Sequence, residues 1–445
     1  MTSQAPWWTV GVLVAVLLVI GYGFVYFVVL QVAGAWLASR ERRAEARRDR
    51  TASPSAPPTF YFLVPCRDEE AVIGETVRSL LAQDDESLVV VIDDASQDAT
   101  AAIAASQDAD RVLVLSRRLP NARLGKGKAL NDGLRFVRRD VAERGLDPAR
   151  VVVGVMDADG RLSPATTEHV GDLFDDARVG GVQLQVRIRN RDTFLTRVQD
   201  IGFWGTSAVA QMGRNATASV SLGGNGQFAR LSALDEVPGE AWTDSLTEDL
   251  DLMITLTVRG WAMRQTSLAW VEQEAPTTLR ALVTQRTRWA QGHMVCAART
   301  GEVLRSPDVS QRTALELTCY LWQPWLLAIP WSVLAPSLVV LAVLRVGDVN
   351  AQHGVLVGLA AVLAWYVLAF VPVLWGSLVY ARRASRYGFV RSFWMHQASF
   401  VLNLVTYAAT WRALVRILTR RRGWAKTTHG EAVPAAAGGP PVAPS

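Results

Sequence analysis

A long stretch near the start of the chain contains no charged residue, and this feature constrains the fold more than any other. The uncharged residues run from 6 to 39, and their apolar core, residues 9–30, is longer than the roughly 20 residues with which a helix crosses a bilayer. A cleaved signal peptide is disfavoured because no basic region precedes the stretch and arginines, rather than a small-residue cleavage site, follow it. We therefore expect a transmembrane anchor over residues 1–39.

The residues after this stretch indicate the side of the membrane on which the next domain lies. Residues 40–50 carry six arginines against three acidic residues, and basic residues accumulate on the cytoplasmic side of membrane spans. We therefore expect a basic juxtamembrane linker over residues 40–58, followed by a cytoplasmic domain at the plasma membrane.

Further apolar runs occur near the end of the chain. Residues 317–344 and 350–381 are uncharged, and each run can span a bilayer once. A third run, residues 392–411, contains His396, Gln397 and Asn403. A third crossing would put the arginine-rich end outside, against the charge bias. We expect a C-terminal membrane region over residues 310–422 with an interfacial or re-entrant third segment, and a cytoplasmic tail over 423–445.

Between these regions, residues 59–309 alternate strand patterns with helical periods. The runs 60–65, 88–92, 112–115 and 151–156 are short and rich in Val, Leu and Ile, which is typical of buried strands. Repeated strand–helix order predicts an α/β domain with a parallel sheet, and ligands bind such sheets beyond the carboxyl ends of the strands. Acidic residues follow two of the runs there, at Asp93, Asp94, Asp157 and Asp159.

Composition excludes several classes of protein. The chain has 46 basic and 41 acidic residues, but the basic residues cluster beside apolar runs, which disfavours nucleic-acid binding. Three distant cysteines provide neither a disulfide framework nor a cysteine metal site. A mean hydropathy of +0.16 with 20% charged residues excludes disorder for most of the chain.

The acidic pairs at the strand ends suit nucleotide and metal binding. Asp157 and Asp159 flank one alanine, so two carboxylates can meet one divalent cation that also binds phosphate oxygens; a solvated turn is the alternative. Asp93 and Asp94 suit hydrogen bonding to a base or ribose, with a helix N-cap cluster as the alternative.

Lysine usage marks a third segment. Only three of the 46 basic residues are lysines, and two of them, Lys126 and Lys128, alternate with Gly125 and Gly127 before a helical period. A glycine-flanked lysine at a helix start suits a diphosphate, because small residues allow the backbone to approach and the helix start favours anions. The spacing of a Walker motif is absent, which disfavours an ATPase.

The second half of the domain contains candidates for acid/base chemistry. A glycine-dense turn over residues 222–230 includes Asn225 and Gln227 and permits close backbone approach to a ligand. Thr247, Glu248 and Asp249 open a helical period. A carboxylate there can accept the proton of an attacking hydroxyl; a helix N-cap with acids in the first turn is the alternative.

A further cluster lies just before the C-terminal apolar runs. Gln285, Arg288 and Trp289 are spaced i, i+3 and i+4 and would share one helix face. An amide and a guanidinium suit a phosphate, and an indole suits the CH groups of a sugar ring. A juxtamembrane arginine and tryptophan belt is the alternative.

Four of these clusters carry a resemblance to a known family: Asp93 with Asp94, Asp157 with Asp159, residues 247–249, and Gln285 with Arg288 and Trp289. In this order and followed by apolar runs, they resemble the motifs of the membrane-embedded family-2 glycosyltransferases, such as cellulose, chitin, hyaluronan and poly-N-acetylglucosamine synthases. The resemblance covers about residues 60–292. It implies a GT-A (Rossmann-like) domain over residues 59–309 with transmembrane helices on both sides. It also implies a UDP-sugar donor, Mg²⁺ or Mn²⁺, and inversion to a β-linkage.

The resemblance also implies roles for individual residues. Asp249 would be the general base, with Glu248 beside it, and Asp157 and Asp159 would engage the nucleotide and the metal. The donor would be bound by Asp93, Asp94, Lys128, Gln285 and Arg288, and the acceptor by Trp289, Asn225 and Gln227. The tail residues Trp424, Lys426 and Thr427 resemble the gating segments that cover the nucleotide in these synthases.

The sequence leaves the acceptor open. A growing β-glycan is one reading, with glucose or N-acetylglucosamine as the hexose. The expected spans provide little material for a polymer channel, so translocation would need a homodimer or an export partner. A single transfer to a lipid such as diacylglycerol is the alternative, because the segments around residues 222–228 and 246–251 resemble relatives of that kind. A non-catalytic nucleotide-binding scaffold of an export complex is a second alternative, and a transporter is disfavoured by the size of the soluble domain.

Overall fold

The computed structural model describes residues 7–48, 57–334, 354–383, 388–398 and 400–421, together with Pro336, Ser337, Val340 and Ala351. The proposed gating residues Trp424, Lys426 and Thr427 lie outside the described residues, so their role stays a prediction.

A seven-stranded sheet forms the centre of the α/β domain. Its strand order is β3-β2-β1-β4-β8-β6-β9. The neighbours β3, β2, β1 and β4 are parallel, whereas β8 runs antiparallel to both β4 and β6. The strands are β1 (Thr59–Cys66), β2 (Leu88–Asp93), β3 (Val112–Ser116), β4 (Val151–Val155), β6 (Val179–Gln183), β8 (Gln227–Arg230) and β9 (Ala262–Arg264). The predicted α/β fold with a mainly parallel sheet is therefore confirmed, and the inserted antiparallel strand is additional to the prediction.

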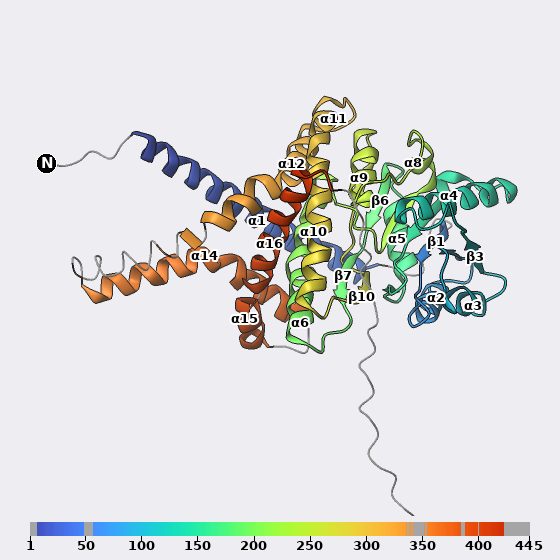
Figure 1. Cartoon of the computed structure of the whole chain (residues 1–445), viewed down its shortest axis with the longest axis horizontal. Helices are drawn as coiled ribbons and strands as arrows, with labels where there is room; N and C mark the ends of the chain where they lie inside the picture. Colours follow the sequence, from blue (N-terminus) through green and yellow to red (C-terminus); the bar gives the residue numbers. More distant parts are fainter. Residues whose placement is uncertain are drawn as a thin grey trace, which may run out of the picture.

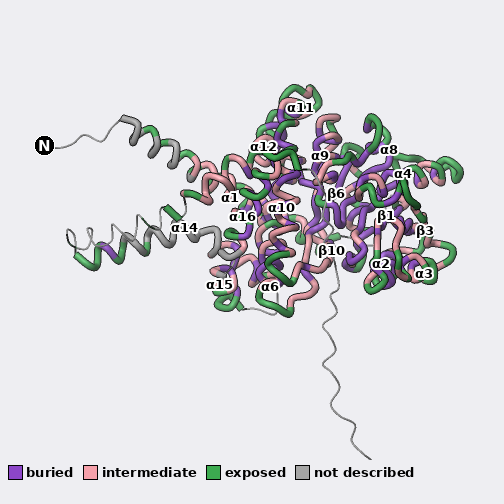
Figure 2. The backbone as a smooth tube through the Cα atoms, in the orientation of Figure 1, coloured by how far each residue is buried: buried purple, intermediate pink, exposed green. Residues whose placement is uncertain are grey.

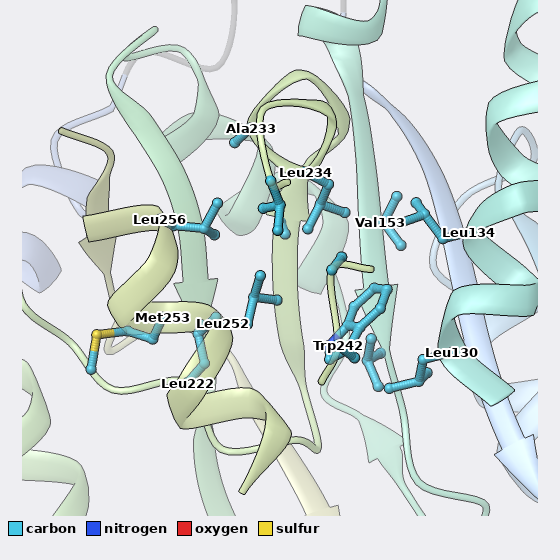
Figure 3. Close-up of a cluster of buried hydrophobic side chains, with 14 of the residues drawn as sticks. Leu130, Leu134, Val153, Leu222, Ala233, Leu234, Trp242, Leu252, Met253 and Leu256 are labelled. Carbon is cyan, nitrogen blue, oxygen red and sulfur yellow. The ribbon is translucent and has the colours of Figure 1, made fainter. Parts of the chain in front are cut away.

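Helices cover both faces of this sheet and enclose two apolar clusters. On one face pack α4 (Lys126–Glu143), α8 (Leu231–Asp235) and α9 (Glu248–Val258), and Figure 3 shows their side chains meeting around Trp242 and Val153. On the other face pack α2 (Ile73–Leu81), α3 (Thr100–Ala105) and α5 (Thr166–Phe174). Because both faces are covered, the central strands carry continuous Val and Ile runs rather than alternating ones.

A smaller sheet lies beside the ends of the main strands. It contains β5 (Arg161–Leu162), β10 (Trp270–Gln273) and β7 (Gln185–Ile188) in the order β5-β10-β7. Its pairing brings residues after β10 next to the loop that follows β4, because β10 is antiparallel to β5.

The N-terminal helix packs closely on the α/β domain. Helix α1 (Trp7–Glu45) crosses α7 (Ala208–Arg214), which follows α6 (Phe194–Asp200) and a π-helical turn, η2 (Ile201–Ser207). A Cβ at Gly34 would overlap the carbonyl of Val209, and one at Gly213 would overlap the carbonyl of Leu30. The two backbones therefore approach so closely that only glycine fits at both positions.

The C-terminal helices return to the same region. Helix α10 (Leu279–Cys296) leads through η4 (Ala297–Arg299) and α11 (Thr300–Arg305) to α12 (Gln311–Leu321) and η5 (Pro324–Ala328). Beyond them follow α14 (Val355–Arg383), α15 (Phe389–Ala398) and α16 (Phe400–Leu418), and α16 packs along α10. Helices α1 and α14 extend from the body on the side opposite β3 (Figure 1), and they carry many exposed residues (Figure 2).

Two stretches of the described residues are long and apolar enough to cross a membrane: Gly21–Glu45 and Phe389–Leu418. The second includes the run for which an interfacial or re-entrant position was expected. Spans on both sides of the domain, their number and the domain boundaries stay predictions.

A buried ion pair connects α1 and α12 to α7 of the domain. Arg214 of α7 donates to both carboxylate oxygens of Glu316 in α12, at 2.8 and 3.1 Å. The hydroxyl of Tyr26 in α1 donates to the same carboxylate at 2.9 Å, and Ser219 donates to it as well. Arg214 is 2% exposed, so its charge is compensated by this carboxylate rather than by water.

Candidate active site

A cavity of about 920 Å³ lies at the carboxyl ends of the parallel strands and continues between the C-terminal helices. Its strand side is formed by residues that follow β1, β2 and β4 and by the first residues of α4 and α9. Its other side is formed by α10 and α16, with single residues of α1 and α12. The cavity therefore has the location at which parallel sheets bind ligands.

The structure brings most of the predicted site residues to this one cavity, although they span nearly two hundred positions of the sequence. The residues that line it are Asp94, Asp157, Asp159, Glu248, Asp249, Gln285, Arg288 and Trp289. Asp93 does not line it: its carboxylate accepts the amide hydrogen of Ser96 at 3.1 Å, and its side chain faces a neighbouring shallow pocket.

The structure places Lys126, rather than Lys128, at the cavity. Lys126 lines the cavity, and its ammonium donates to Asp157 and, at 3.3 Å, to the carbonyl of Gly224. Lys128 instead pairs with Glu240 at 2.6 Å on the outer surface. The two residues are i and i+2 in α4, and such residues point about 200° apart around a helix. Lys128 is therefore misplaced by the prediction, and Lys126 is the lysine at the site.

The two residues expected to contact the acceptor from the glycine-dense turn do not line the cavity. Asn225 accepts the amide hydrogen of Asp157 at 3.1 Å and donates to Gln273 at 3.0 Å. Gln227 is 2% exposed and pairs across the sheet with Val155. Asn225 thus holds the loop after β4 in place, and Gln227 belongs to the core.

Asp249 lies at the bottom of the cavity beside the glycine-dense turn. A Cβ at Gly224 would be 2.9 Å from its Oδ2, and Gly224 has φ of 77°, a conformation that favours glycine. Burial, followed by the negative charge of Glu248, raises the pKa of Asp249 from 3.8 to about 7. The amide hydrogen of Leu250 and the charges of Lys126 and Arg288 oppose this rise. A carboxylate with a pKa near neutrality can both accept and release a proton.

Asp159 is largely buried, and hydrogen bonds to its neighbours hold both its carboxylate and its backbone carbonyl. Its Oδ2 accepts the amide hydrogen of Glu274 at 2.8 Å, and its carbonyl accepts from Arg189 at 3.1 Å. Arg189 also pairs with Glu274 at 2.8 Å. Among the residues that the structure describes, no group of three or more His, Cys, Asp or Glu side chains is arranged to hold a metal by itself.

Helix α10 presents two neighbouring faces to the cavity. Gln285 and Arg288 lie on the face that also contains Gly292, where a Cβ would be 2.5 Å from the hydroxyl of Thr247. This face is therefore turned toward the start of α9 and Asp249. Arg288 Nε has no hydrogen-bond partner among the described residues.

The second face of α10 carries residues that sequence reasoning missed, apart from Trp289. Arg286, Trp289, Ala290 and His293 all line the cavity, and their spacing of i, i+3, i+4 and i+7 places them on one stripe. The ring of Trp289 meets Phe203 of η2 edge-on, with centroids 6.1 Å apart. The helical phase of α10 was the signal that could have identified Arg286.

The far part of the cavity has a mixed polar and aromatic lining. Helix α16 contributes Asn403, Thr406 and Thr410, which are spaced i, i+3 and i+7 along an apolar helix. His293 contacts the carbonyl of Tyr320 through Nε2 at 2.9 Å, and burial lowers its pKa to about 4. His293 is therefore neutral at physiological pH.

Residues 57–292 match a known sequence family, and two characterised enzymes are similar over about the same region. The sequence model described as "Glycosyltransferase like family 2" matches residues 57–292, more than half of the chain. A β-monoglucosyldiacylglycerol synthase of Trichormus variabilis is 34% identical over 249 residues, which are 53% of this chain and 49% of that protein. A poly-β-1,6-N-acetyl-D-glucosamine synthase of Staphylococcus aureus is 28% identical over 235 residues, 52% and 53% of the two chains. This chain therefore spans about half the length of these relatives.

Among solved structures, a mannosyltransferase from Pyrobaculum calidifontis in complex with GDP-Man and Mn²⁺ is similar over most of the chain. The TM-score is 0.50 at 18% identity, and the match covers 91% of this chain and 99% of that one. At this identity the likeness shows the fold alone, and it confirms that the α/β domain is of the GT-A-like kind.

Proposed function

Because the chain belongs to glycosyltransferase family 2 and is therefore an enzyme of this class, we propose that it transfers a hexose from a UDP-sugar to a hydroxyl group of a membrane-bound glycan or lipid acceptor. The hexose is glucose or N-acetylglucosamine. The single observation that carries the proposal is the convergence of Asp157, Asp249 and Trp289, which are distant in sequence, on one cavity.

The strand end of the cavity would bind the nucleotide diphosphate. Asp94 lies at the end of β2, where a base or ribose can accept and donate hydrogen bonds. The guanidinium of Arg288 and the amide of Gln285 face the same space and suit the diphosphate. Lys126 takes the position proposed for Lys128 and would exchange Asp157 for a phosphate when the donor binds.

The residues at the end of β4 fit a divalent cation. Asp157 presents a carboxylate to the cavity and already pairs with the ammonium of Lys126, and Asp159 lies beside it. Oxygen ligands of this kind suit Mg²⁺ and Mn²⁺, and the diphosphate would complete the ligand set. When bound, the metal would neutralise the charge of the departing diphosphate.

Asp249 would act as the general base. As the acceptor oxygen bonds to the anomeric carbon, the bond from that carbon to the phosphate oxygen breaks and its electron pair leaves with UDP. The hydroxyl proton passes to Asp249, whose raised pKa of about 7 makes it basic enough to hold it. Attack opposite the leaving group inverts the anomeric centre to a β-linkage, and Trp289 would support the acceptor next to the reacting hydroxyl.

The acceptor would reach this site from the bilayer. Helix α16 forms part of the far side of the cavity and α1 contributes Phe27 to it, and both helices overlap the two stretches able to cross a membrane. Because six arginines follow the first apolar stretch, the domain would lie at the cytoplasmic face of the plasma membrane. A single transfer to a lipid is favoured over polymer synthesis by one observation: the diacylglycerol glucosyltransferase relative is more similar than the polymer synthase, at 34% against 28% identity.

The test uses the full chain purified in detergent with Mg²⁺ or Mn²⁺. UDP release from UDP-glucose and UDP-N-acetylglucosamine is measured, and products are separated into glycolipid and polymer. We expect UDP release with a glycolipid product from wild type and none from Asp249→Asn, which should still bind UDP. Absence of UDP release from wild type with every donor would support the non-catalytic scaffold instead, and a polymer product would support the glycan acceptor.

A further inference from the structure

The charge of Arg286 in the cavity has no counterion among the described residues. The guanidinium of Arg286 lies 4.6 Å from the ring centroid of Trp289 and 5.1 Å from that of Phe203. Within the described ranges it makes no hydrogen bond or ion pair. Among the other arginines and lysines of the lining, Lys126 pairs with Asp157 and Arg67 with Asp68. Arg123 donates to the carbonyl of Ala95, and Arg288 lies within the electrostatic influence of Asp249.

The two rings do not compensate for this charge. A cation–π contact stabilises by about 0.5–2 kcal/mol, whereas removing an ion from water costs several kcal/mol. Burial lowers the pKa of Arg286 to about 10, and no charged neighbour offsets that effect. Water can solvate the guanidinium while the cavity is open. A neutral ligand that fills this part of the cavity would displace that water and leave the charge without a partner.

The position of Arg286 separates it from the donor. It is i+1 and i−2 relative to Gln285 and Arg288, so it points about 100° and 200° away from them around α10. The acidic residues of the lining all come from strand-end loops and the start of α9, and none comes from α1, α10, α12 or α16 among the described residues. An anion at Arg286 would therefore enter on the acceptor side and would not be the diphosphate already assigned to Arg288.

We propose that the acceptor carries an anionic group, a phosphate, and that Arg286 binds this phosphate while Trp289 supports the part of the acceptor next to the attacked hydroxyl. This inference rests on the proposed function and specifies its substrate class: a hydroxyl-bearing phospholipid rather than a neutral glycan or diacylglycerol. The phosphate stays on the acceptor throughout, and the hydroxyl proton passes to Asp249 as in the transfer described above.

The experiment compares two acceptors with the same acyl chains in detergent micelles. Dioleoyl phosphatidylglycerol offers hydroxyls and a phosphate, and dioleoylglycerol offers a hydroxyl without charge. We expect wild type to glycosylate phosphatidylglycerol with the higher kcat/KM. A charge-assisted hydrogen bond is worth enough to change this ratio about 10- to 100-fold. Arg286→Gln should lose that preference through a higher KM for phosphatidylglycerol, whereas its kinetics with dioleoylglycerol should change little.

Two variants and one lipid sharpen the test. Arg286→Lys should recover part of the preference because it restores the charge. Arg280→Gln, which removes an exposed arginine of the same helix outside the cavity, should behave as wild type. Dioleoyl phosphatidylmethanol has the phosphate without a hydroxyl, so we expect it to inhibit wild type as a competitor of phosphatidylglycerol and to inhibit Arg286→Gln much less.

Three outcomes would overturn the inference. Equal losses with both acceptors in Arg286→Gln would mean that the arginine only positions Trp289. Stimulation of dioleoylglycerol transfer by phosphatidylmethanol, without glycosylated phosphatidylglycerol, would mean that the phosphate acts at the membrane surface. Transfer to dioleoylglycerol alone would reject the anionic acceptor while leaving the proposed function intact, whereas no UDP release with any acceptor would reject both.

Discussion

The pKa of Asp249 makes a specific prediction about the pH dependence of transfer. If Asp249 must be ionised to accept the hydroxyl proton, the rate follows its ionised fraction. With a pKa of about 7, this fraction is about one tenth at pH 6 and about nine tenths at pH 8, so kcat/KM for the donor should rise about tenfold between these values. This parameter reports the pKa values of the enzyme before the donor binds.

The charged neighbours of Asp249 determine in which direction its pKa should shift when they are replaced. Glu248 is the second cause of the raised pKa after burial, so Glu248→Gln should move the midpoint to lower pH, and the variant should keep a larger share of its plateau rate at pH 6. Lys126 and Arg288 lower the same pKa, so Lys126→Met should move the midpoint upward. Glu240→Gln, which removes a carboxylate on the outer surface beside Lys128, is the matched control and should leave the midpoint unchanged.

The assay is UDP release at fixed ionic strength from pH 5.5 to 9, with the donor well below its KM. A rate that is flat between pH 6 and 8 in wild type would refute Asp249 as a base of raised pKa. A midpoint that rises in Glu248→Gln would refute the electrostatic reasoning, even if Asp249 is the base.

Three further predictions follow from the same geometry. Burial raises the pKa of Asp249 from 3.8 to about 7, so the ionised carboxylate destabilises the fold by up to about 4 kcal/mol, a cost that grows as the pH rises between these two values. The inactive variant Asp249→Asn should therefore unfold at a higher temperature than wild type at pH 8, and equal melting curves at pH 8 would contradict this. Lys126→Met should weaken UDP binding in calorimetry whereas Lys128→Met should not, because only Lys126 lines the cavity; the reverse pattern would restore the prediction made from sequence. Gly213→Ala should lower the unfolding temperature because its Cβ would overlap the backbone of α1, whereas Gly11→Ala, with open space around it, should not, and equal effects would argue against close helix packing.

The sequence predicted the parallel strands themselves and the sheet edge at which the cavity lies, because buried strands depend on local patterns of apolar residues. The run 60–65 became β1 (Thr59–Cys66), and the acids after β2 and β4 meet at one cavity. The antiparallel insertion of β8 between β4 and β6 was not predictable in this way, because strand pairing over tens of residues leaves no local pattern.

At the site, the sequence predicted which segments lie near the cavity, but not which side chains of those segments point into it. Lys126 and Lys128 share a segment, and only the first turn of α4 decides which of them faces the cavity. Asn225 was predicted to bind the acceptor, but its side chain accepts the amide hydrogen of Asp157 and so fixes the loop. A motif in sequence indicates where a residue lies, and the side-chain direction depends on where the helix or turn begins.

The ion pair of Arg214 and Glu316 limits how this enzyme can be shortened. Residues 59–309 have the appearance of a separable unit in sequence. Excision at those limits would remove Glu316, the ion-pair partner of Arg214, and Tyr26, which donates a hydrogen bond to Glu316. Arg214 would then lose its counterion together with the helices that bury it, and the apolar surface of α7 that packs against α1 would be exposed to water. A fragment designed for crystallisation should therefore retain α1 and α12, even though neither carries a catalytic group.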